Sequence, residues 1–150
     1  MDIPEKKERF KLFAASYVVL VKDGKVLLLG RANTGYEDGS YSMIAGHAEG
    51  DESMTSVAVR EAREEAGISI KPEDLVLKLM MHRKTDREYA DFFFEAKKWE
   101  GEVKNCEPQW CSNLNWFPMD NLPENTIPYI RKAIEAYQSG VNYLEIGFEK

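Results

Sequence analysis

Apolar and β-branched runs alternate with polar turns along most of the chain, and this pattern predicts strands on both sides of a central helix. The segments 15–21 and 25–29 are predicted strands, joined by Asp23-Gly24, a dipeptide that tolerates the positive φ angles of a tight hairpin. The remaining expected strands are 41–45, 75–81, 88–97 and 115–117, and the polar loops between them are 31–40, 46–51 and 82–87. Charged residues dominate 1–12, which is expected to be a peripheral arm.

Two helices are predicted. The segment 52–66 is rich in helix formers, lacks internal Gly and Pro, and stops before Gly67, a residue suited to a C-terminal cap. In 128–137 the apolar positions recur with helical spacing, at Ile130, Ala133, Ile134 and Tyr137. The tail 141–150 is left unassigned. This order of elements predicts one α/β domain over 1–150, with a mixed sheet flanked by helices.

The first of these helices carries acidic residues on the face that should be buried. At 100° per residue its apolar stripe consists of Met54, Val57, Ala58 and Ala62. Glu61 and Glu65 lie in the middle of that stripe. Like charges one turn apart repel, and a desolvated carboxylate without a partner costs several kcal/mol. A cation is the expected partner, and oxygen ligands suit Mg²⁺ or Mn²⁺; a solvated acidic face is the alternative.

Charge and composition narrow the class of protein. The 150 residues carry a net charge of −6, and the segment 46–68 holds six carboxylates and two arginines, a net of −4. An acidic chain argues against a nonspecific binder of long nucleic acids. The sequence has no apolar run of roughly 18 residues and no apolar signal segment at its start, so we expect a cytoplasmic protein without a membrane partner. Two cysteines make neither a disulfide scaffold nor a four-ligand zinc site.

The acidic segment has a distinctive spacing. Gly46, five residues, Glu52, seven residues and then REAREEAGI at 60–68 resemble the Nudix box, G-x5-E-x7-R-E-U-x-E-E-x-G-U, with every fixed position present. The upstream hairpin, the loop NTGYEDGSY and the later NCEPQWCSNLNWFPMDNLPEN also resemble Nudix proteins of the MutT-like kind, so the resemblance covers about 13–137. One departure is Ile44-Ala45, where many members have a proline before the box glycine.

The resemblance implies a Nudix fold, an α/β/α sandwich around a mixed β-sheet. It also implies hydrolysis of a nucleoside diphosphate linked to another group, with Mg²⁺ or Mn²⁺ as cofactor. By position, Glu61 and Glu65 match the main metal ligands, and Glu64 matches an additional ligand or water-orienting acid. Ala45 matches a residue whose main-chain carbonyl often joins the metal shell.

Three more residues receive roles through the resemblance. Arg60 matches the arginine that orients a box glutamate, and Glu52 matches the glutamate that supports the site. The general base is either a box glutamate or an acid on a later loop, for which Glu107 is the best candidate, with an exposed loop acid as the equal alternative.

The substrate and the assembly stay open. By elimination a nucleoside triphosphate leads, including oxidised or noncanonical ones; a nucleoside diphosphate sugar or ADP-ribose comes next. A non-catalytic nucleotide-binding regulator is the alternative from another class, and a homodimer is open because Nudix proteins often form dimers. Tyr36 and Trp110 are the candidates for stacking on a base. Surface charges are the expected role of the following residues, with phosphate contact as the alternative: Arg31, Arg83, Lys84 and Arg87. His47 is expected to be structural or solvent-facing, with phosphate contact as the alternative, and His82 is expected to be a strand-end residue.

Overall fold

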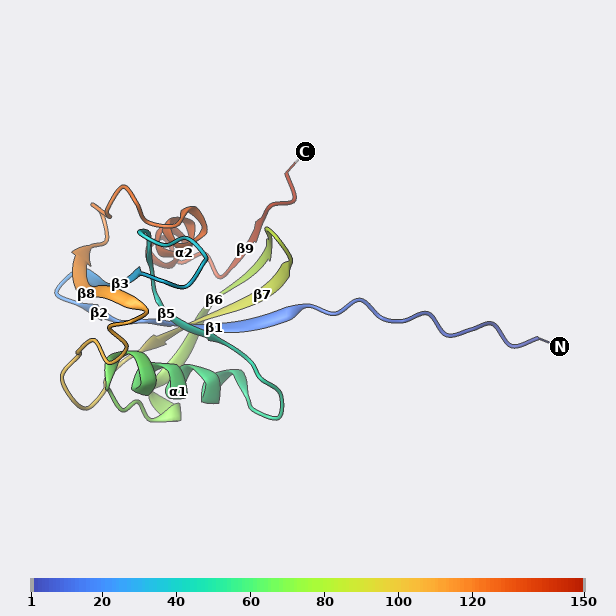
Figure 1. The fold of residues 1–150 in the computed structure, drawn as a ribbon, viewed down its shortest axis with the longest axis horizontal. Helices are drawn as coiled ribbons and strands as arrows, with labels where there is room; N and C mark the ends of the chain where they lie inside the picture. The colour runs from blue at the N-terminus through green and yellow to red at the C-terminus, as the bar shows by residue number, and fades with distance from the viewer. Residues whose placement is uncertain (1, 150) are drawn as a thin grey trace.

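The computed structural model describes residues 2–149, which form a mixed sheet between two helices (Figure 1). The strands are β1 (Phe13–Val19), β2 (Val21–Lys22), β3 (Lys25–Arg31), β4 (Tyr41–Ser42), β5 (Ile44–His47), β6 (Leu75–Lys84), β7 (Glu88–Ala96), β8 (Cys111–Pro118) and β9 (Tyr143–Ile146). The helices are α1 (Met54–Ala66), the short η1 (Pro72–Asp74) and α2 (Pro128–Ser139). The main sheet has the order β5-β1-β7-β6-β9, and β3 pairs with β2, β4 and β8 in a second sheet.

Strand β1 separates two hydrophobic cores, because successive side chains of a strand point to opposite faces. Tyr17 and Val19 join the core under α2, whereas Val18 and Leu20, just beyond the strand, join the core under α1. The sheet is mixed, since β1 pairs with β7 in parallel and with β5 antiparallel. Helix, sheet and helix form three layers, so the predicted α/β/α arrangement is confirmed.

Helix α1 is fixed at both ends. Ser53 is extended (φ −75°, ψ 157°) and its side chain accepts a hydrogen bond from the Ser56 N–H, so the helix begins at Met54 rather than at residue 52 as predicted. Gly67 ends it with φ 68°, the left-handed conformation that favours glycine. The buried hydroxyl of Ser16 on β1 donates to the Met54 carbonyl at 2.6 Å and ties the first turn to the sheet.

Several predicted boundaries were wrong. Strand β8 spans eight residues rather than 115–117, because pairing with β3 extends it in both directions. The loop 82–87 shrinks to three residues, since β6 and β7 pair as far as Lys84 and Glu88. The unassigned tail contains β9, which pairs with β6 in parallel; position 150 of that tail lies outside the described residues.

The termini differ in their packing. Residues 2–12 lead away from the body in Figure 1 and are exposed; position 1 lies outside the described residues. Among residues 2–149, every helix is too short or too polar to cross a bilayer.

Candidate active site

The carboxylates of α1 face strand β5. The backbone N–H of Ala45 donates to Glu65 Oε2 at 3.3 Å, and the Glu61 side chain lies directly against Gly46. A Cβ atom at position 46 would collide with the Glu61 carboxyl group, so glycine is required for this close approach. The structure therefore places the two glutamates on the inward face of α1, as the helical wheel predicted, and shows that this face lies against β5.

Burial and mutual repulsion raise the pKa values of these acids. Desolvation raises the pKa of Glu61, and the nearby charges of Glu64 and Glu107 add to it. Desolvation also holds the pKa of Glu65 well above its usual range, and repulsion by Glu61 adds to it. The pair is thus a site where a bound cation would relieve repulsion.

The loop after β7 brings Glu107 to the same place. The Cys106 N–H donates to the Glu65 carbonyl at 3.2 Å, which fastens the loop to the end of α1. The Asn105 side chain accepts from the Glu107 N–H at 3.1 Å and donates to the Cys111 carbonyl at 2.7 Å. Burial and the charge of Glu64 raise the pKa of Glu107. Glu107 and Glu65 line a common cavity of about 100 Å³.

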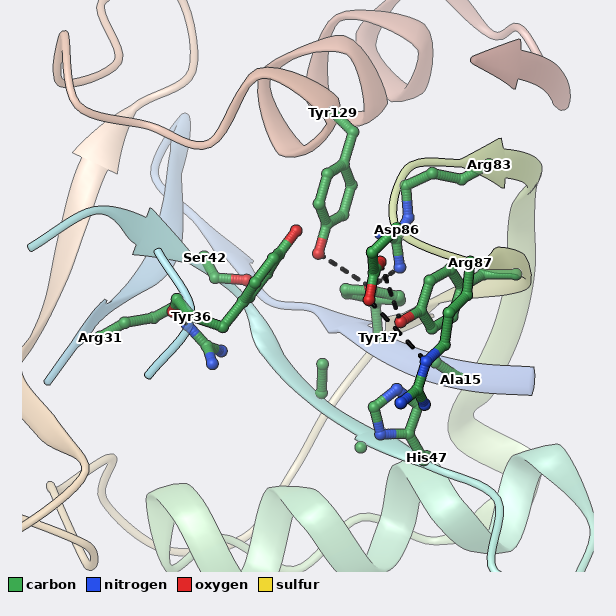
Figure 2. A pocket seen from close by; sticks show the side chains of 13 residues that line it. Ala15, Tyr17, Arg31, Tyr36, Ser42, His47, Arg83, Asp86, Arg87 and Tyr129 are labelled. Atoms are coloured by element: carbon green, nitrogen blue, oxygen red, sulfur yellow. Dashed lines mark hydrogen bonds and ion pairs between the residues drawn. The ribbon is translucent and has the colours of Figure 1, made fainter. Parts of the chain in front are cut away.

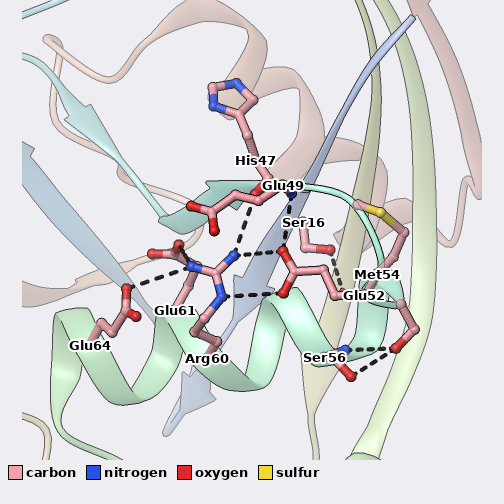
Figure 3. Close-up of polar contacts among 10 residues, drawn as sticks. Ser16, His47, Glu49, Glu52, Met54, Ser56, Arg60, Glu61 and Glu64 are labelled. Atoms are coloured by element: carbon pink, nitrogen blue, oxygen red, sulfur yellow. Dashed lines mark hydrogen bonds and ion pairs between the residues drawn. The ribbon is translucent and has the colours of Figure 1, made fainter.

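Arg60 is the centre of an ion-pair network (Figure 3). Its guanidinium contacts Glu52 at 2.9 Å, Glu61 at 2.8 Å and Glu64 at 3.7 Å. The Glu49 N–H also donates to Glu52 at 3.1 Å, and the bond from Arg60 together with this one lowers the pKa of Glu52. Arg60 therefore fixes the Glu61 carboxylate from the solvent side, and Glu52 in turn fixes Arg60.

The donor set fits a hard divalent cation. The acidic side chains that gather here offer carboxylate oxygens, which Mg²⁺ and Mn²⁺ prefer. Within residues 2–149, no group of three or more His, Cys, Asp or Glu side chains is arranged to hold a metal ion. Mg²⁺ usually keeps several waters and uses only one or two protein carboxylates, so the carboxylates of Glu61 and Glu65 are enough protein ligands for one ion.

A pocket of about 420 Å³ opens beside this cluster (Figure 2). Ala45 and Gly46 form part of its wall, so β5 is shared between the pocket and the glutamates. The pocket is lined mainly by aromatic and cationic side chains: Tyr17, Tyr36, Tyr89, Tyr129, His47, Arg31, Arg83 and Arg87. Asp86 is the one carboxylate in this lining. This cavity has the size and the mixture of apolar and polar groups of a small-molecule site.

Arg83 was predicted as a surface charge, and that prediction was wrong. The residue is 3% exposed and its Nε donates to Asp91 Oδ2 at 2.7 Å. Its guanidinium carbon lies 4.0 Å from the ring centroids of both Tyr89 and Tyr129. Arg83 thus joins β6, β7 and α2 at the base of the pocket, and a buried carboxylate is what allows a charge at this position.

The other predicted residues lie around the two cavities. His47 is exposed and stacks on Tyr89 at 5.9 Å between ring centroids, as a structural role implies, while it also lines the pocket. Trp110 lines the smaller cavity with Glu65 and Glu107, and Arg31 lines both cavities. The stacking roles of Tyr36 and Trp110 stay predictions. His82 of β6 pairs with Ala90 of β7, and its ring lies 3.2 Å from the Glu88 carboxylate.

Sequence reasoning missed four residues that shape the pocket, and they come from three secondary-structure elements and one turn: Tyr17, Asp86, Tyr89 and Tyr129. An alternation along β1 and β7 could have assigned Tyr17 and Tyr89 to one face of the sheet. It could not have shown that α2 brings Tyr129 to the same place, with the Tyr129 and Tyr17 hydroxyls 3.2 Å apart.

Comparison with known proteins places this geometry in a family. A NUDIX domain model matches residues 11–137. NudC of Stutzerimonas stutzeri, an NAD-capped RNA hydrolase, is 30% identical over 145 residues, covering 91% of this chain and 45% of that protein. The phosphatase NudJ of Escherichia coli is 25% identical over 142 residues, covering 89% of this chain and 88% of that protein.

Solved structures agree on the fold. The MutT NUDIX hydrolase from Burkholderia pseudomallei superposes with a TM-score of 0.77 at 24% identity, covering 84% of this chain and 98% of that one. The chain spans about half the length of the NudC relatives that it matches. Since the family model covers most of the chain and every fixed residue of the box is present, the chain belongs to the NUDIX family.

Proposed function

We propose that this protein hydrolyses the diphosphate linkage of a small nucleotide derivative with the help of Mg²⁺ or Mn²⁺. The observation that carries the proposal is the contact of Glu61 and Glu65 with the same strand, β5, that walls a pocket of tyrosines and arginines. A nucleoside in the pocket would then have its diphosphate beside the carboxylates.

Each residue of the cluster has a role in this proposal. Glu61, Glu65 and the main-chain carbonyl of Ala45 hold the ion, and Glu64 is an additional ligand or orients the attacking water. When bound, the ion supplies positive charge that offsets the phosphate oxygens and makes a nearby water more acidic.

The remaining residues position the metal ligands and accept the proton of the attacking water. Arg60 keeps Glu61 in place through its 2.8 Å contact, and Glu52 positions Arg60. The proton of the attacking water passes to Glu64, or to Glu107 on the facing loop.

A nucleoside triphosphate is the first candidate substrate, because the pocket of about 420 Å³ has room for a nucleoside and Arg31 lines the path from it to the carboxylates. A nicotinamide dinucleotide is the second candidate, since the Stutzerimonas relative is named for hydrolysis of NAD-capped RNA. Nucleoside diphosphate sugars and ADP-ribose complete the set to be tested.

The test is a panel of these nucleotides with Mg²⁺, in which released phosphate, pyrophosphate and nucleoside monophosphate are measured. Turnover of at least one compound is expected, with complete loss in excess chelator and recovery when Mg²⁺ is restored. Turnover that persists in chelator would contradict the metal dependence. Binding of metal and nucleotide without turnover of any compound would favour the regulator.

A further inference from the structure

A second cavity adjoins the nucleoside pocket on the side of the N-terminal arm. It has a volume of about 310 Å³ and lies between the end of the arm and the β6–β7 turn. We call it the arm groove and define it by Phe10, Lys11, Phe13, Lys84 and Arg87. Arg87 also lines the nucleoside pocket, but the other four residues have no role in the hydrolysis proposed above, so the groove requires its own explanation.

Aromatic rings and a guanidinium form a continuous series from the pocket into the groove. The Tyr89 ring, which lines the pocket, lies 5.8 Å from the Phe13 ring between centroids. The Arg87 guanidinium carbon lies 4.7 Å from the centroid of Phe13. Phe13 is 46% exposed and Phe10 is 72% exposed, so both residues are accessible from solvent. Exposed aromatic rings interleaved with cations are the arrangement that binds single-stranded nucleotides.

The charges of the groove leave room for a phosphate. Within residues 2–149, neither Lys11 nor Lys84 forms an ion pair. Two carboxylates also line the groove: Glu88 contacts His82 at 3.2 Å, and Asp86 accepts from the Thr85 hydroxyl at 2.9 Å and lies 3.9 Å from the Arg87 guanidinium. Three cations against two carboxylates leave the groove with a net positive charge, which complements an anionic group.

The order of the cavities indicates which part of a ligand would enter the groove. Arg31 lines both the carboxylate cavity and the nucleoside pocket, whereas Asp86 and Arg87 line both the pocket and the groove. Arg31 and Arg87 lie on opposite sides of the pocket in Figure 2. A ligand with its 5′-diphosphate at the carboxylates and its base in the pocket would direct its 3′ side to the groove.

We propose that the arm groove binds the second nucleotide of a 5′-phosphorylated single strand, with its phosphate on Lys11, Lys84 and Arg87 and its base on Phe13 and Phe10. This proposal rests on the proposed function in one respect, because it assumes that the first nucleoside binds in the pocket. A dinucleoside polyphosphate would not use the groove in the same way, because its second nucleoside lies beyond the diphosphate.

Equilibrium binding in metal-free buffer tests the groove apart from catalysis. Calorimetry would compare adenosine 5′-monophosphate with the dinucleotide pApA, and the uridine pair would repeat the comparison. The wild-type protein should bind the dinucleotide about tenfold more tightly, which is the size expected for stacking one base on an aromatic ring.

Two variants separate the groove from the pocket. Phe13→Ala and the double variant Lys11→Gln/Lys84→Gln should lower dinucleotide affinity to the level of the mononucleotide and leave mononucleotide affinity unchanged, because these residues do not line the pocket. Phe148→Ala is the matched control, since Phe148 is similarly exposed (41%) and lies against His82. Melting temperatures close to the wild type would show that the variants are folded.

Equal affinity for the two ligands would overturn the proposal, as would a dinucleotide advantage that survives both variants. A second copy of the chain in the groove would also overturn it, and would appear as self-association in sedimentation that the same variants abolish. Absence of hydrolysis with a retained dinucleotide advantage would contradict only the proposed function, so the two failures are distinguishable.

Discussion

The two sides of strand β5 are built in opposite ways. On one side, Glu61 and Glu65 come from one turn of one helix, and their positions follow from sequence spacing alone. On the other side, the pocket combines Tyr17 of β1, Tyr89 of β7 and Tyr129 of α2, which are brought together only by the fold. A site within a single helix can thus be predicted from its periodicity, whereas a pocket shared among elements depends on topology.

The two sides also differ in charge. The helix side gathers carboxylates whose pKa values are raised by burial and repulsion, and the pocket side gathers arginines and tyrosines. Bound cations would complement the carboxylates of the helix side, and phosphate groups would complement the arginines of the pocket side. If this division is correct, substitutions on the helix side should change kcat, and substitutions on the pocket side should change KM.

Glu65→Gln tests the helix side most severely. The change keeps the shape of the side chain and removes a ligand charge, so kcat should fall by at least about 10³-fold with little change in KM. Folding should be retained, because a buried carboxylate with a raised pKa is replaced by a neutral group. Steady-state kinetics and thermal melting measure both effects.

The matched control is Glu73→Gln in the exposed turn η1, which should have normal kinetics. Near-normal turnover of Glu65→Gln would refute the assignment of this glutamate.

Gly46→Ala tests the contact between the two sides. The added Cβ would displace the Glu61 carboxyl group, and a displacement of about 1 Å can cost about 10²-fold in rate, so a loss of about that size in kcat is expected. Ala45→Gly, which removes a methyl group from the next residue of β5, is the control and should retain most of the rate. Full activity of Gly46→Ala would show that the Glu61 position is not critical.

The same contrast explains how much the sequence could predict. The box spacing predicted that Arg60 pairs with a box glutamate, and the structure brings Arg60 and Glu61 into contact because both lie on one helix. The burial of Arg83 could not be predicted, since its partner Asp91 lies on the neighbouring strand and pairing register decides which side chains meet. Strand β9 was missed for a related reason: pairing with β6 stabilises a four-residue segment whose own pattern is weak.

Arg83→Met tests the pocket side. Removing the guanidinium leaves Asp91 buried without its partner, which should lower the free energy of unfolding by about 3–5 kcal/mol. Removing the guanidinium also removes the cation that contacts both the Tyr89 and the Tyr129 ring, so KM should rise about tenfold. The kcat of the protein that remains folded should change little. Chemical denaturation and kinetics at low temperature measure the two effects.

The double variant Arg83→Met/Asp91→Leu separates charge from packing, because it removes both members of the ion pair. Stability should recover, but KM should stay high, since no cation then holds the two rings. A fall in kcat without a change in KM would contradict the division between the two sides of β5.

Tyr36→Ala should give the smallest effect and the cleanest measure of the pocket. Tyr36 is 39% exposed on a loop that is held independently, by the bond from Arg31 Nε to the Tyr36 carbonyl at 2.7 Å and by the Asp38 side chain. The ring contributes little to the core, so the melting temperature should not change. Loss of a stacking surface should raise KM about fivefold at constant kcat, and Tyr36→Phe should keep the wild-type KM because it keeps the ring. Equal KM values for the alanine variant and the wild type would exclude Tyr36 from the base-binding surface and leave the buried tyrosines as the aromatic wall.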